Sequence, residues 1–256
     1  MQPRELWERY MGCYDYLTGV GSYVANLHEI AAATALQPGS RVLDAGSGTG
    51  NLSLLLKERG ADVVACDFSE SALACHRRKD PRAELVRASL EERLPFDDAS
   101  FKTVYCASVL FALSKSGCAL ALREFRRVLQ PGGRLVVTVA APEKRNRRLV
   151  SMHLRSMVRE HGWRVGTMRF LFRLPDLLRV LHYNRRLQGL PDWQGYHRFD
   201  EDELRGALRE AGFGIVDLRR TYAGSFFLAV CEKPRERVQA AGMDKRASRP
   251  LVAASA

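Results

Sequence analysis

The sequence predicts an α/β fold in which a parallel sheet carries helices on both faces. Short apolar runs of strand length alternate with amphipathic segments of helix length between residues 41 and 140, as repeated strand–helix units require. The first apolar run, residues 41–45, leads directly into Gly-Ser-Gly-Thr-Gly at 46–50, which is typical of a sharp turn from a strand into a helix. A chain of 256 residues can bury the core of one such domain.

The segments around the glycine-rich turn fit this fold in order. Residues 6–33 mix tyrosines with apolar residues and predict a helical segment that is broken near Gly19–Gly21. The first strand, residues 41–45, begins after the turn-forming sequence Gln37-Pro38-Gly39. Residues 52–59 then have the spacing of an amphipathic helix, and a glycine ends it.

The remaining elements alternate in the same way. Ser69 suits a helix N-cap, with Glu70 in the first turn, and Asp200 suits the N-cap of the last helix. The two final strands flank a short turn and should pair antiparallel. The expected elements are strands at 61–66, 83–87, 101–106, 134–140, 214–219 and 225–231, and helices from residue 69 and over 119–129 and 201–211.

Three glycines stand at alternate positions of the turn, at 46, 48 and 50. Glycine permits unusual backbone angles and lets a ligand lie directly against the chain. The dinucleotide fingerprint Gly-x-Gly-x-x-Gly is not met, because its last position is Asn51. Asp67 ends the next strand, where its carboxylate is placed to accept hydrogen bonds from both hydroxyls of a ribose.

Together with three later motifs, this turn resembles the class I S-adenosylmethionine-dependent methyltransferases. The motifs are Leu94-Pro95-Phe96, the strand at 101–107, and Arg-Val-Leu-Gln-Pro-Gly-Gly at 127–133. The resemblance covers residues 40–231. It implies a Rossmann-like, seven-stranded methyltransferase sheet with one reversed strand and helices on both faces.

The resemblance also implies S-adenosylmethionine as the cofactor and the residues around it. The three glycines approach its amino acid part, Asp44 orders the turn, and Asp67 holds the ribose. The implied cofactor-binding residues are Tyr14, Asp44, Gly46, Gly48, Gly50, Asp67, Phe68, Ser89, Leu90 and Ala107. We expect no metal site, and the six cysteines contain no Cys-x-x-Cys pair.

Catalysis asks little of such a protein, because a sulfonium is already an activated methyl donor. The enzyme must align the acceptor with the methyl carbon and exclude water. A general base is needed only where the acceptor is protonated at neutral pH, and histidine suits that task. The candidates are His197, His153 and Tyr16. His76, in contrast, is expected on the surface of its helix.

The net charge is +11, from 40 basic and 29 acidic residues, and most of the excess lies in one segment. Residues 144–188 hold twelve Lys or Arg against Glu160 and Asp176, interleaved with apolar residues. Three interpretations fit: a lid with its arginines in solvent, a surface that meets an anionic amphiphile or membrane, or a nucleic acid surface. We expect no nucleic acid partner, because no RNA-binding module is visible and strand four ends Tyr-Cys-Ala-Ser, not Asn/Asp-Pro-Pro-Tyr.

These observations predict methyl transfer to a small or lipid-like acceptor. An RNA methyltransferase and a non-catalytic scaffold subunit that binds the cofactor are the alternatives. The intact glycine turn and Asp67 favour an enzyme.

We expect one domain, residues 1–232, with an N-terminal helical cover at 1–36 and a basic helical lid at 142–196. Residues 233–256 lack periodicity and are expected to be disordered. No run approaches the roughly 18 apolar residues of a membrane span, and residues 1–10 carry charges where a signal peptide needs an apolar run. With cysteines that resemble buried thiols, these features predict a cytoplasmic protein; the membrane interpretation would add a peripheral position at the membrane.

Overall fold

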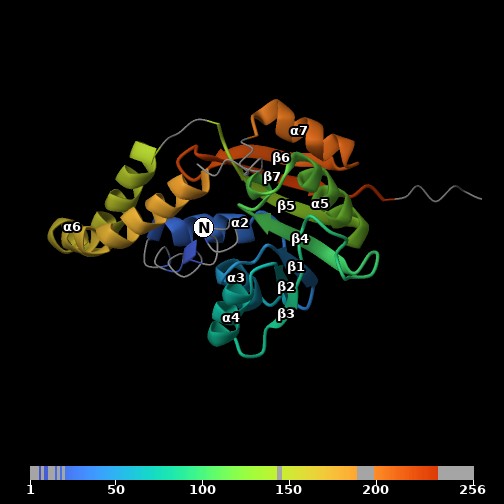
Figure 1. Cartoon of the computed structure of the whole chain (residues 1–256), viewed down its shortest axis with the longest axis horizontal. Helices are drawn as coiled ribbons and strands as arrows, with labels where there is room; N and C mark the ends of the chain where they lie inside the picture. The colour runs from blue at the N-terminus through green and yellow to red at the C-terminus, as the bar shows by residue number, and fades with distance from the viewer. Residues whose placement is uncertain are drawn as a thin grey trace, which may run out of the picture.

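The computed structural model describes residues 6, 9, 10, 15, 18, 21–142, 146–188 and 199–235. Within them, one sheet contains β1 (Arg41–Ala45), β2 (Asp62–Asp67), β3 (Glu84–Arg87), β4 (Phe101–Ala107), β5 (Leu129–Ala140), β6 (Gly214–Thr221) and β7 (Phe226–Glu232). The spatial order is β3-β2-β1-β4-β5-β7-β6 (Figure 1). Strand β7 runs antiparallel to both of its neighbours, β5 and β6, and all other neighbouring strands are parallel, so the predicted seven-stranded sheet with one reversed strand is confirmed.

The described helices are α2 (Gly21–Ala31), α3 (Asn51–Glu58), α4 (Glu70–Lys79), α5 (Lys115–Val128), α6 (Asn146–Gln188) and α7 (Glu201–Glu210), with a 3₁₀ turn, η2 (Leu110–Ala112). The predicted N-caps are confirmed: Ser69 accepts a hydrogen bond from the backbone of Ala72, and Asp200 forms a capping box with Glu203.

Two element starts between residues 41 and 232 differ from the prediction by more than one residue. Helix α5 begins earlier than residue 119, because the Ser114 hydroxyl caps it by accepting the Gly117 N–H at 3.0 Å. Strand β5 begins at Leu129 and not at Arg134, because Leu129 already pairs with Phe101 of β4. The pairing is irregular between Phe101 and Thr103, opposite the Pro-Gly-Gly sequence, where Gly132 has a φ of 73°.

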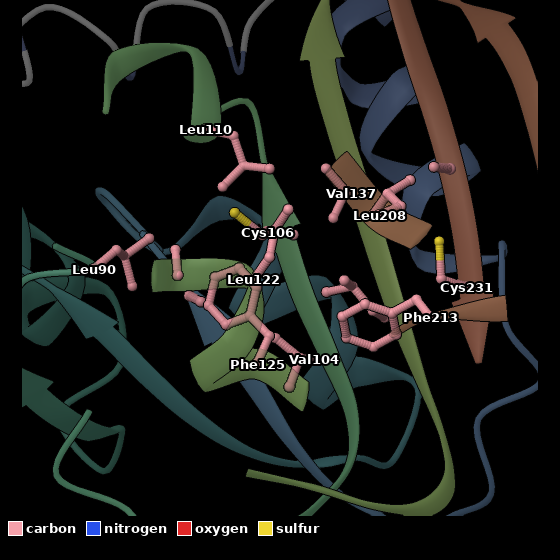
Figure 2. Packing of buried hydrophobic residues seen from close by; sticks show 14 of the residues in the cluster. Leu90, Val104, Cys106, Leu110, Leu122, Phe125, Val137, Leu208, Phe213 and Cys231 are labelled. Carbon is pink, nitrogen blue, oxygen red and sulfur yellow. The ribbon is translucent and has the colours of Figure 1, made fainter. Parts of the chain in front are cut away.

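The hydrophobic core lies on both faces of the sheet. Successive strand residues point to opposite faces, so Val136 and Val137 of β5 belong to two different clusters. Helices α2 and α3 cover the first cluster, which contains Val136. Helices α5 and α7 cover the second cluster, which contains Val137. Figure 2 shows Leu122 and Phe125 of α5 and Leu208 of α7 in the second cluster. Helices on both faces are therefore confirmed.

The predicted basic lid contains a helical hairpin. Helix α6 is interrupted at Gly162, whose φ of 77° is not helical. A Cβ added at Gly166 would lie 2.6 Å from the Cα of Val158, which requires the chain to fold back on itself. We call residues 146–161 the inner arm and residues 163–188 the outer arm. Figure 1 shows α6 projecting away from the sheet on the side of α2.

Met157 of the inner arm packs against Tyr23 of α2, which fixes the hairpin to the domain. In the described part of the chain, no helix has both the length and the apolar character needed to cross a membrane. The boundaries of the predicted cover, lid and tail stay predictions, because residues 143–145, 189–198 and 236–256 lie outside the described residues.

Arg127 of α5 organises the loop between β3 and β4. Its guanidinium donates to Glu124 at 2.7 and 2.9 Å, to Asp98 at 2.7 Å, and to the carbonyl oxygens of Phe96 and Leu94 at 2.7 and 3.0 Å. Glu124 also accepts the Leu94 N–H at 2.9 Å. One partly buried cation therefore holds the loop that carries the Leu-Pro-Phe motif.

Replacing Arg127 by Met should lower the free energy of unfolding by about 2 kcal/mol, because two carbonyl oxygens and the buried Glu124 lose a charged donor. Urea denaturation measures the change. Asp98→Ala is the matched control: its carboxylate is exposed, and its loss should leave the free energy of unfolding nearly unchanged. Equal losses in the two variants would contradict this account of the loop.

Candidate functional site

The carboxyl ends of β1, β2 and β4 meet at the glycine turn. The backbone N–H groups of Gly46 and Ser47 donate to the carbonyl oxygen of Cys66 in β2, at 2.8 and 3.0 Å. Val109, which follows β4, lies so close to Gly46 that a Cβ there would be 2.5 Å from a Val109 methyl carbon. Ligands bind at this edge of open parallel sheets, where the strand order reverses.

All three glycines of the turn adopt left-handed backbone angles. Their φ values are 76° at Gly46, 54° at Gly48 and 84° at Gly50. A side chain at any of them would be strained, and a Cβ at Gly50 would collide with the ring of His76. The turn requires glycine for its conformation as well as for access.

Asp67 joins the end of β2 to the glycine turn. One carboxylate oxygen accepts the Gly48 N–H at 2.8 Å, and the other accepts the Ser69 N–H at 2.9 Å. A carboxylate has about four lone-pair sites in all. A buried carboxylate in this place is suited both to holding the turn and to accepting hydrogen bonds from ligand hydroxyls.

Asp44 is buried beneath the turn, where its carboxylate accepts the Ser53 hydroxyl at 2.5 Å. Burial raises the pKa of Asp44 to about 7; the Ser53 hydrogen bond opposes this shift, and the negative charge of Asp67 adds to it. The hydroxyl oxygen of Ser47 is also buried and has no hydrogen-bond partner among the described residues. These groups fit S-adenosylmethionine, which carries cationic and hydrogen-bonding groups.

The other predicted cofactor residues follow the same edge of the sheet. Phe68 comes directly after Asp67 and is exposed, and Ala107 ends β4. The Ala88 N–H donates to the Asp67 carbonyl at 3.1 Å, which brings Ser89 close to the end of β2. Leu90 is buried in the core beside that position. Tyr14 lies outside the described residues.

Sequence reasoning missed a polar cluster on the outside of the turn. The Lys79 ammonium donates to Asp15 at 2.7 Å, to the Thr49 carbonyl at 2.9 Å and to the Asn51 side chain at 2.8 Å. Asp15 also accepts the Thr49 hydroxyl at 2.5 Å. Asp15 lies between Tyr14 and Tyr16, which were both predicted at the site. This position in the sequence was the signal that could have identified Asp15. The cluster ties part of the N-terminal segment to the turn.

The expectation that His76 lies on the surface is wrong. Its side chain is buried against Gly50, and burial lowers its pKa to about 4, with the charge of Lys79 adding to the effect. The missing side chain at Gly50 makes room for the ring. Helix periodicity alone does not reveal such a space.

Among the three candidate bases, only His153 falls in the described chain; His197 and Tyr16 do not. His153 is buried, its Nδ1 contacts the Ser22 hydroxyl, and its Nε2 lies 3.2 Å from the Tyr222 hydroxyl. Burial lowers the pKa of His153 to about 4, which keeps the ring neutral at neutral pH. Ser22 and Tyr222 were not predicted, because they come from α2 and the β6–β7 turn.

The chain is similar to known proteins over this region and beyond it. A sequence profile described as a methyltransferase domain matches residues 43–137. The demethylmenaquinone methyltransferase of Clavibacter sepedonicus is 33% identical in an alignment of 231 residues that covers 82% of this chain and 81% of that protein. The malonyl-[acyl-carrier protein] O-methyltransferase of Erwinia pyrifoliae is 44% identical over 102 residues, 39% of this chain and 38% of that protein.

The fold is also similar to that of a solved SAM-dependent methyltransferase from Thermotoga maritima. The TM-score is 0.59 at 19% identity, over 90% of this chain and 99% of that one. The sheet order, the glycine turn with Asp67 and the relative aligned over 82% of this chain agree. The chain belongs to the class I S-adenosylmethionine-dependent methyltransferases.

Proposed function

We propose that this enzyme transfers a methyl group from S-adenosylmethionine to a small or lipid-like acceptor. The observation that carries the proposal is the buried Asp67 carboxylate, which accepts the Gly48 N–H where three strand ends meet. The two relatives support the class of acceptor, because one is named for demethylmenaquinone and the other for malonyl-[acyl-carrier protein].

The bound cofactor would supply a methyl group on a sulfonium, so the chain's own task is binding, orientation and exclusion of water. Asp67 would accept hydrogen bonds from the ribose hydroxyls. The buried Ser47 hydroxyl would also gain a hydrogen-bond partner from the bound cofactor. Asp67, together with Asp44 in its ionised form, would place negative charge beside a cationic ligand. We also propose that Phe68 and Ser89 contact the adenine and that Ala107 faces the methionine end of the cofactor.

We propose a peripheral contact between residues 144–188 and an anionic membrane. The segment is strongly basic and contains the projecting helical hairpin. Such a contact would bring the enzyme to a lipid-like acceptor. Co-sedimentation with anionic vesicles tests it, and equal binding to neutral vesicles would argue against a basic contact.

Asp67→Ala should weaken S-adenosylmethionine binding on the order of tenfold to a hundredfold, because the buried ribose hydroxyls would lose their acceptor. Isothermal titration calorimetry measures the affinity, and thermal unfolding checks that the variant is folded, since Gly48 also loses a partner. Asp97→Ala, on the exposed β3–β4 loop, is the matched control and should bind normally. Unchanged affinity in a folded Asp67→Ala protein would refute the ribose assignment.

Asp44→Asn should stabilise the protein more at high pH than at low pH. The folded-state pKa of Asp44, about 7, exceeds its ordinary value of 3.8, so its ionisation costs stability as the pH rises through this interval. Asparagine keeps an acceptor for Ser53 without the charge. Urea denaturation should show the variant's advantage growing by at most about 3 kcal/mol from about pH 5 to about pH 8, because only the part of the pKa shift above pH 5 is sampled. An advantage that does not change with pH would exclude an elevated pKa.

The pH dependence of kcat, measured with demethylmenaquinone as trial acceptor, distinguishes between the candidate bases His153, His197 and Tyr16. A basic histidine must be neutral, so the rate falls when the pH drops below its pKa. For His153 we expect a flat profile between about pH 5 and about pH 8, because its pKa is about 4. His153→Gln, His197→Gln and Tyr16→Phe are compared; a variant with unchanged kcat removes that residue from the list.

A further inference from the structure

The outer arm of α6 exposes large apolar side chains. Phe172 is 85% exposed and Trp163 is 69% exposed, although isolated aromatic residues of this size are usually covered. The exposed set within residues 163–188 is Trp163, Val165, Met168, Leu171, Phe172 and Leu178. Among the described residues, the only large apolar side chains exposed elsewhere are Phe68 and Val216.

Four of these side chains share one face of the helix. Met168, Leu171, Phe172 and Leu178 follow the spacing i, i+3, i+4 and i+10, which places them along one stripe. The opposite side of the arm is the one that packs inward: Gly166 meets the backbone of the inner arm, Phe170 packs against Tyr23 and Met157, and Val180 is buried. The arm therefore has a complete buried face and a second, outward apolar face.

Arginines surround the outward stripe. The outer arm carries six of them against a single acidic residue, Asp176. The Arg164 guanidinium lies over the Trp163 ring at 5.1 Å, and Arg169 contacts His161 of the inner arm. Guanidinium groups at the edge of an apolar face suit phosphate headgroups, while the apolar side chains enter the acyl boundary.

We infer that the outward face of the outer arm, formed by Met168, Leu171, Phe172 and Leu178 with the flanking Arg164, binds the surface of an anionic lipid bilayer. The inference rests on the proposed function, in which a lipid-like acceptor would be collected from that surface. Charge decides against a second copy of the chain as the occupant: two such arms would bring their arginines together, whereas anionic headgroups complement them.

The proposed bilayer-binding face of the outer arm shares no residue with the cofactor site. The inner arm carries His153, which contacts Ser22 and Tyr222, and Met157, which packs on α2. None of the stripe residues belongs to the described core clusters. Substitution in the stripe should therefore leave cofactor affinity intact.

The test uses the full chain and its Leu171→Ser/Phe172→Ser variant, in co-sedimentation with vesicles of phosphatidylcholine alone or mixed with phosphatidylglycerol. The unaltered protein should bind the mixed vesicles, less strongly as salt is added. The double variant should bind them on the order of tenfold or more weakly, because two large apolar side chains no longer leave water. Val216→Ser, an exposed valine on β6, is the matched control and should bind like the parent.

Arg164→Gln should weaken binding to the mixed vesicles without changing the small binding to phosphatidylcholine. Undiminished binding by the double variant would overturn the inference, as would absence of binding by the parent. A parent dimer that the double variant converts to monomer would also overturn it, because the face would then be covered by a second copy. Calorimetric titration with S-adenosylmethionine is run in parallel: lost cofactor binding in the parent would refute the proposed function, while the vesicle result is judged separately.

Discussion

The hydrogen bond from the Gly48 N–H to the Asp67 carboxylate is the contact on which the site depends. It joins the loop after β1 to the end of β2, two points that are 19 residues apart in the chain. The same carboxylate receives the Ser69 N–H and so also positions the start of α4. Helix α4 in turn brings His76 against Gly50 and Lys79 against Thr49. A single acid therefore aligns the turn from both sides.

Electrostatics around this contact favour a cationic ligand. Asp44 and Asp67 are both buried, and the negative charge of Asp67 adds to the burial that makes ionisation of Asp44 less favourable. In the folded protein this is a cost, offset in part by the Ser53 hydroxyl. A sulfonium and an ammonium nearby would turn that cost into attraction. These two acids therefore make the folded protein less stable than apolar residues at the same positions would. Such a cost is common where residues serve ligand binding and not folding.

Sequence signals that act within a few residues predicted the fold well. The Ser69 and Asp200 caps and the glycine turn are local, and each lies where it was expected. The starts of α5 and β5 were misjudged because Ser114 and the pairing of Leu129 with Phe101 outweigh local preference. The predicted cofactor residues that follow strand ends lie along one edge of the sheet, and their binding roles stay predictions. Contacts between distant segments, such as Lys79 with Asp15, 64 residues apart, leave no such signal.

The break at Gly162 affects which substitutions the sequence can accept during evolution. Because the chain reverses there, α6 presents one helix to the domain and keeps a second helix whose far side takes no part in the described core. Side chains on that far side can be exchanged with little effect on folding. Substitutions there would therefore accumulate faster under drift than substitutions in the core, while the catalytic domain stays the same.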